Sequence, residues 1–168
     1  MRRAVAVVLA LAACGTAAAD PRFHGAWTLE TVTIRSADGE VTPDAYGADA
    51  RGMLSYQPSG HMMAMVTRDG RPPAGRSRGD ASDAEVMQAF NTLIAYAGRW
   101  SVEGDTVTHH VDVADWPARV GTDQVRQFRF DGERLILSAT ATGADGLEQR
   151  YELTWRRLAA SSGNEVIE

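Results

Sequence analysis

Residues 107–137, VTHHVDVADWPARVGTDQVRQFRFDGERLIL, decide the fold of this chain. Residues 106–113 and 123–130 alternate between apolar and polar side chains, as half-buried β-strands do. Asp131-Gly132 separates the second of these runs from a third one, residues 134–142. An Asp-Gly pair between two alternating runs is a strong hairpin signal. This part of the chain is therefore predicted to form consecutive antiparallel strands.

Further strand-like runs lie on both sides of this stretch, at residues 23–35, 52–57, 61–68, 99–102 and 147–158. Pro58-Ser59-Gly60 is a short turn and predicts a hairpin between two of them. With the three runs above they make eight strands, enough to close a barrel with room for one small ligand. Closure also removes the sheet edges that invite aggregation. The predicted fold is all-β, an eight-stranded antiparallel up-and-down β-barrel.

One helix is predicted to be inserted before the fourth strand. Residues 69–81, DGRPPAGRSRGDA, are rich in Gly, Pro and Arg and indicate a loop. Ser82 and Glu85 then have the spacing of a helix capping box. Apolar side chains follow at helical spacing, at Val86, Phe90, Leu93, Ile94 and Ala97. Gly98 is a suitable residue at which to end this helix.

Residues 1–19 have the pattern of a signal peptide. Arg2 and Arg3 precede an apolar run, residues 4–13, and small residues at 16–19 suit cleavage before Asp20. The apolar run is shorter than the roughly 20 residues that a membrane-spanning helix needs. We therefore expect an exported protein, periplasmic or secreted, with a barrel domain at residues 20–158 and a disordered tail at 159–168.

Cys14 gives the same segment a second interpretation, because Leu11-Ala12-Ala13-Cys14 resembles a bacterial lipobox. Lipidation at Cys14 would make the protein a membrane-anchored lipoprotein, and this anchor is the only membrane contact that we expect. The choice between the two processing routes stays open. Cys14 is the only cysteine, so either route leaves the barrel without a disulfide, a cysteine nucleophile or a cysteine metal ligand.

The charged residues exclude several classes of function. All 17 basic residues are Arg, which excludes lysine Schiff-base chemistry and a P-loop lysine. The formal net charge is −5, and removal of Arg2 and Arg3 would make it more negative. An acidic domain without a basic stripe is a poor nucleic-acid binder, so no nucleic-acid partner is expected. The sequence contains no dinucleotide fingerprint.

His109 is the first candidate for a functional residue. Period-2 alternation places it in phase with Val107, Val111 and Val113, so its side chain should point into the barrel. His110 should point the opposite way, so the two imidazoles cannot bind one metal, and we expect neither a metal nor a cofactor. A buried His109 would be either a hydrogen-bonded core residue or a donor and proton shuttle toward a ligand.

Arg126 is the second candidate, because it is in phase with Phe128 and Phe130. An inward Arg needs a partner, since an unpaired buried charge is costly. That partner could be a carboxylate of Asp112, Asp123 or Glu148, or the anionic head of a ligand. His109 and Arg126 come from neighbouring strands, and inward side chains on such strands lie close enough to meet.

The remaining candidates are apolar or aromatic. Met53, Met62, Met63 and Met65 make a Met-rich hairpin, and thioether side chains adapt to ligands of irregular shape; ordinary core packing is the alternative. The complete set of predicted ligand-contacting residues is Tyr56, Met63, Met65, Trp100, His109, Arg126, Phe128 and Tyr151.

The chain resembles the bacterial lipocalin-like domain family, a branch of the calycin-type barrels. The resemblance rests on Gly25-Ala26-Trp27, residues 50–56 (ARGMLSY) with Gly60-His61-Met62, Phe90 through Tyr96 to Gly98, the block 107–137 and residues 151–155 (YELTW). It implies an up-and-down barrel with a cavity for a small, mostly apolar molecule. It also implies that Trp27 lies at the closed end under an Arg, either Arg157 or Arg126. The inserted helix departs from the usual lipocalin layout, in which a helix follows the eighth strand.

We therefore expect an exported barrel that binds a small apolar or amphipathic molecule. One alternative is a barrel enzyme, a cyclase or isomerase, in which His109 acts as acid or base and Arg126 stabilises negative charge. Another is a lipid-anchored envelope protein whose barrel mainly contacts other proteins. The sequence specifies neither the ligand nor the oligomeric state.

Overall fold

The computed structural model describes residues 20–72, 77–143 and 146–159. The predicted signal peptide, Cys14 and nearly all of the predicted tail lie outside these residues. The strands are β1 (Gly25–Ser36), β2 (Val41–Thr42), β3 (Arg51–Tyr56), β4 (His61–Thr67), β5 (Leu93–Glu103), β6 (Thr106–Ala114), β7 (Asp123–Asp131), β8 (Arg134–Thr142) and β9 (Glu148–Arg157). The helices are α1 (Asp83–Asn91) and three 3-10 turns, η1 (Pro21–Phe23), η2 (Arg78–Asp80) and η3 (Pro117–Arg119).

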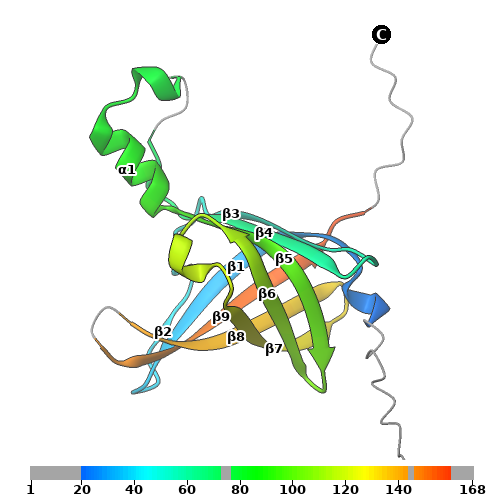
Figure 1. Cartoon of the computed structure of the whole chain (residues 1–168). Coiled ribbons are helices and arrows are strands. Elements are labelled where there is room, and N and C mark those ends of the chain that lie inside the picture. Colours follow the sequence, from blue (N-terminus) through cyan, green and yellow to red (C-terminus); the bar gives the residue numbers. More distant parts are fainter. Residues whose placement is uncertain (1–19, 73–76, 144–145, 160–168) are drawn as a thin grey trace, which may run out of the picture.

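Eight of these strands form a closed antiparallel barrel, as Figure 1 shows. β1 and β3 to β9 pair in sequence order, and β1 also pairs with β9 along its length, from Trp27 opposite Arg157 to Ser36 opposite Gln149. The predicted fold class is therefore confirmed. β2 was not predicted from the sequence. It pairs with Ile34 and Arg35, near the end of β1.

The helix is shorter than predicted. The capping box between Ser82 and Glu85 is present, but α1 ends at Asn91. The apolar residues from Leu93 onward, predicted to be helical, begin β5 and pair with β4, from Leu93 opposite Thr67 to Gly98 opposite Met62. A short apolar run fits either periodicity, and here pairing with β4 decides the outcome. Figure 1 shows α1 projecting away from the barrel between β4 and β5, and none of its residues is buried.

A β-bulge between β5 and β6 turns Val113, which was predicted to point into the barrel, to the outer face. Gly98 pairs with Val111 and Ala97 with Val113, so Asp112 is the extra residue on β6. Gly98 is required there, because an added Cβ would lie 1.9 Å from the carbonyl oxygen of His110. Val113, predicted to share the inner face with His109, consequently points outward and is 61% exposed.

One end of the barrel is closed by aromatic packing around Phe23, which η1 inserts into the core. The Phe23 ring lies 4.8–5.4 Å, centre to centre, from the rings of Tyr56, Trp100, Phe128 and Phe130. Phe23, Tyr56 and Trp100 are buried in this cluster, Phe128 and Phe130 are partly buried, and such aromatic pairs stabilise beyond their buried area.

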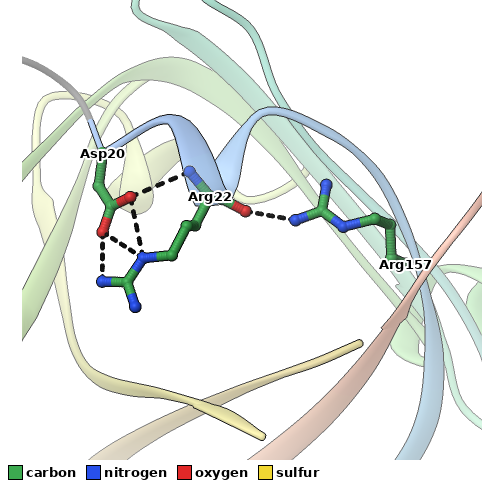
Figure 2. A network of polar contacts seen from close by, with 3 residues as sticks. All are labelled: Asp20, Arg22 and Arg157. Atoms are coloured by element: carbon green, nitrogen blue, oxygen red, sulfur yellow. Dashed lines mark hydrogen bonds and ion pairs between the residues drawn. The ribbon is translucent and has the colours of Figure 1, made fainter. Parts of the chain in front are cut away.

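Trp27 lies in this closed end, as predicted, with its indole Nε1 donating to the Phe23 carbonyl at 2.9 Å. Arg157 covers it, its guanidinium carbon 4.1 Å from the centre of the Trp27 ring. Figure 2 shows how the Arg157 guanidinium also reaches the Arg22 carbonyl, while the Asp20 carboxylate holds the Arg22 side chain and caps η1. Of the two arginines considered for this position, Arg157 is the one that fills it.

Candidate ligand cavity

The barrel encloses a cavity of about 300 Å³ between the closed end and the opposite rim. Alternating inward residues of the strands supply mostly apolar walls, among them Leu54, Val66, Leu137 and Leu153. Tyr46 and Arg68 lie at the rim far from Phe23, and the Arg68 guanidinium stacks over the Tyr46 ring at 4.3 Å. Polar groups are confined to a few side chains, as in most small-molecule sites.

The central polar feature is a chain of three side chains from β3, β6 and β5. The Tyr56 hydroxyl lies 2.6 Å from His109 Nε2, and the Tyr96 hydroxyl lies 2.9 Å from His109 Nδ1. His109 is only 1% exposed. Burial lowers the pKa of His109 to about 3, with smaller electrostatic contributions from Arg126 and His110. The imidazole is therefore neutral at physiological pH and carries one proton.

The hydrogen-bond partners decide which nitrogen carries that proton. Tyr56 is 1% exposed and its hydroxyl contacts no acceptor other than His109 Nε2 among the described residues, whereas Tyr96 lines the cavity, so we assign Tyr56 as the donor. His109 then donates from Nδ1 to the Tyr96 oxygen. Burial raises the pKa of both tyrosines, so both keep their protons. The Tyr96 O–H remains free to donate into the cavity that Tyr96 lines.

Arg126 also lines the cavity, on the neighbouring strand β7. Its guanidinium donates to the Val125 carbonyl at 2.9 Å and to Gln124 Oε1 at 3.3 Å. Burial raises the pKa of Tyr96, and the positive charge of Arg126 lowers it. The two side chains therefore lie close enough in the cavity to interact. The predicted orientation of His109 and Arg126 into the barrel is confirmed.

No carboxylate forms an ion pair with Arg126 among residues 20–72, 77–143 and 146–159. Of the three predicted partners, Asp112 lies 3.6 Å from Arg99, and Asp123 lies 2.7 Å from His110 Nδ1. Glu148 forms no ion pair within the same part of the chain. Arg126 is therefore not held in an ion pair with any of the three carboxylates considered for it.

The other predicted ligand-contacting residues are divided between three places. Tyr151 lines the cavity together with His109 and Arg126. Tyr56, Trp100 and Phe128 belong to the packed closed end around Phe23. Met63 and Met65 are exposed on the outer wall, because Met62 takes the inward position on β4. They line a shallow hollow of about 660 Å³ on the outside of the barrel.

Three polar residues that line the cavity lie outside the predicted set of ligand-contacting residues. Tyr96 was assigned to the helix, and reading residues 93–98 as a strand would have placed it in phase with Ile94. Gln124 is in phase with Arg126 on β7 and could have been found by the same alternation. Trp155 lines the cavity, and its buried indole Nε1 has no hydrogen-bond partner in the described part of the chain.

The described residues offer no metal site, since no three His, Cys, Asp or Glu side chains converge there. Among the same residues, no helix has the length and apolar character needed to cross a membrane.

Comparison with protein-family models matches residues 24–158 to the lipocalin-like domain family. The chain is also 36% identical over 107 residues to the 4'-hydroxy-3'-methoxypropiophenone carrier protein of Aspergillus oryzae, an alignment that covers 58% of this chain and 96% of the relative. A crystal structure of an uncharacterized protein from Bacteroides eggerthii superposes with a TM-score of 0.40 and 10% identity, covering 81% of this chain and 99% of that one.

Proposed function

This chain belongs to the lipocalin-like domain family, and we propose that its barrel carries one small, largely apolar molecule whose hydrogen-bond acceptor points at Tyr96 and Arg126. The observation that carries the proposal is the relay from Tyr56 through His109 to Tyr96. With Tyr56 assigned as the donor to His109 and His109 as the donor to Tyr96, the Tyr96 proton is left for a ligand.

The polar end of the cavity is rich in donors. Tyr96 offers an O–H, and Arg126 offers guanidinium N–H groups. A carbonyl, phenolate or carboxylate oxygen satisfies such donors, and a ligand without an acceptor would leave them buried and unpaired. The rest of the wall is apolar and favours a hydrocarbon or aromatic body.

The volume limits the size of the ligand. A cavity of about 300 Å³ is at the lower end of the range for small-molecule sites. This suits a molecule with one aromatic ring better than a long acyl chain. The relative from Aspergillus oryzae is named for carrying an aromatic ketone, which has the same combination of an apolar ring and a carbonyl acceptor. That name supports aromatic ketones as the first ligands to test.

The same geometry argues against the enzyme alternative that uses His109 as a base. Both of its ring nitrogens are engaged by tyrosines, and its pKa is about 3. A general base works best with a pKa near the working pH. We therefore assign His109 the role of positioning the Tyr96 proton.

The direct experiment is a calorimetric titration of the purified barrel with two matched compounds. We expect 4'-hydroxy-3'-methoxypropiophenone to bind more tightly than the analogue in which a methylene replaces the carbonyl. Losing one hydrogen bond to buried donors should weaken binding by about 1–3 kcal/mol. Equal affinities would contradict the proposed role of the donors, and the absence of binding by both would contradict the ligand class.

We also propose that the protein acts outside the cytoplasm. The basic start, apolar run and small residues of the first 19 residues support this proposal. The soluble exported form and the form lipidated at Cys14 remain its two versions.

A further inference from the structure

The outer wall of the barrel holds a hydrogen-bonded series of a serine, a histidine and an aspartate. Ser101 on β5 places its Oγ 2.9 Å from His110 Nε2. His110 on β6 places its Nδ1 2.7 Å from Asp123 Oδ1 on β7. The series runs across three neighbouring strands, because His110 pairs directly with Asp123 and Ser101 lies two residues from Arg99, the partner of His110 on β5.

With a neutral imidazole at His110, the protons of this series have one consistent arrangement. The Asp123 carboxylate only accepts, so His110 donates to it from Nδ1. His110 Nε2 is then a lone-pair acceptor and takes the hydrogen bond from Ser101 Oγ. This is the order of roles in serine hydrolases, with a nucleophile, a general base and a carboxylate that orients the base. The constellation is recognised by geometry and not by its place in a fold.

Access and charge favour chemistry at Ser101. Its side chain is exposed, and His110 and Asp123 are 32% and 59% exposed, so a reagent can reach the series from solvent. Arg99 lies on the same face beside it, with its guanidinium 3.6 Å from Asp112. Because Arg99 is two residues from Ser101 on the same strand face, we assign it as the positive group that would stabilise an oxyanion on a substrate at Ser101.

We propose that Ser101 is a surface nucleophile that is acylated by small activated esters, such as aryl acetates. Ser101 Oγ attacks the ester carbonyl while His110 Nε2 takes its proton. The ester C–O bond breaks, and the leaving phenol receives that proton. Water then hydrolyses the acyl-Ser101 ester, returning the free hydroxyl and releasing the acid. The outer hollow of about 660 Å³ is not lined by Ser101, His110 or Asp123, so small acyl groups are the class expected.

The test is covalent labelling with a fluorophosphonate probe, followed by peptide mass spectrometry. Ser59 is the matched control, because its Oγ lies 3.1 Å from His61 Nδ1 and no carboxylate contacts His61 among the described residues. We expect the adduct on Ser101 and not on Ser59. His110→Gln should lower labelling at least about tenfold, far less than the ~10⁴ of a complete enzyme triad, and Asp123→Asn should lower it as well.

Two further measurements keep the result clear. All three residues lie on the outer wall, so the variants should keep the wild-type melting temperature. If His110→Gln does not fold, Asp123→Asn alone tests whether the series activates Ser101. Saturation of the inner cavity with the aromatic ketone should leave labelling unchanged, which separates this site from the carrier function. An unlabelled Ser101, equal labelling of Ser59, or labelling that persists in both folded variants would overturn the proposal.

Discussion

The Tyr56 hydroxyl lies 2.6 Å from Nε2 of His109 in the interior of the barrel. With Tyr56 as the donor, this contact sets the direction of both hydrogen bonds that link Tyr56, His109 and Tyr96. Because Tyr56 donates there, the proton of His109 is on Nδ1 and the Tyr96 proton is directed away from the imidazole. A residue in the packed closed end thus controls which hydrogen bond the cavity can offer to a ligand.

Tyr56→Phe should therefore affect both stability and binding. The substitution leaves His109 Nε2 buried without a partner, which should cost about 1–3 kcal/mol of unfolding free energy. It also frees the imidazole to accept from Tyr96, so the affinity for an aromatic ketone should fall. Tyr96→Phe is the control, since it removes the ligand's donor itself. Urea unfolding and calorimetric titration measure the two effects, and unchanged ketone affinity in Tyr56→Phe would refute the relay.

Arg126→Leu should weaken the binding of ligands with an anionic or carbonyl oxygen much more than that of alcohols of similar size. It should not destabilise the barrel through a stranded charge, because no carboxylate forms an ion pair with Arg126 among the described residues. Arg129→Leu is the matched control, since Arg129 lies on the same strand but faces outward toward Glu152 at 3.2 Å. A large loss of melting temperature in Arg126→Leu alone would instead indicate a structural ion pair.

Alternation along a strand predicts part of the site from the sequence, and it does not predict Tyr96. His109 and Arg126 were placed inside because alternation along one strand is a local property. Tyr96 was missed because residues 93–97 fit a helix as well as a strand, and only pairing with β4 distinguishes them. Helix propensity and hydrophobic periodicity are local properties of the sequence. The partner of Ala95 in the sheet is Met65, which lies 30 residues earlier in the chain.

The bulge at Gly98 shows the same limit. Regular alternation predicted Val113 to face inward with His109, but one extra residue in β6 reverses its face. That bulge depends on the close approach of the Gly98 backbone to the His110 carbonyl, a contact between two strands. The closed barrel itself was predictable, since it required only the number of strands and the turns between them.

The buried His109 should make the protein less stable in mild acid. Its pKa is lowered to about 3 in the folded protein, so the unfolded chain binds one more proton between that value and the ordinary value of 6.5. Unfolding free energy should therefore fall as pH drops through this window, at up to about 1.4 kcal/mol per pH unit from this residue. His109→Leu should show a shallower slope in urea unfolding measured from pH 7 to pH 4. Equal slopes would mean that His109 is not buried as a neutral imidazole.

Export is tested by the mass of the mature protein isolated from its natural host. We expect a chain that begins at Asp20, or one that begins at Cys14 and carries acyl groups. The second form should partition with membranes and the first should not, since acyl chains provide the anchor. A full-length chain that retains Met1 and stays in the cytoplasm would contradict the predicted signal peptide.

Trp27→Ala should be among the most destabilising substitutions in the barrel. Trp27 is buried at the closed end, donates to the Phe23 carbonyl at 2.9 Å and supports Arg157 at 4.1 Å from its ring. Its truncation should cost on the order of 3–5 kcal/mol, as for other large aromatic side chains in cores. Trp116→Ala is the matched control, because Trp116 is 57% exposed and its loss should stay below about 1 kcal/mol. Chemical unfolding of both variants gives the comparison. Similar losses for the two tryptophans would mean that Phe23 and Arg157 do not close this end of the barrel around Trp27.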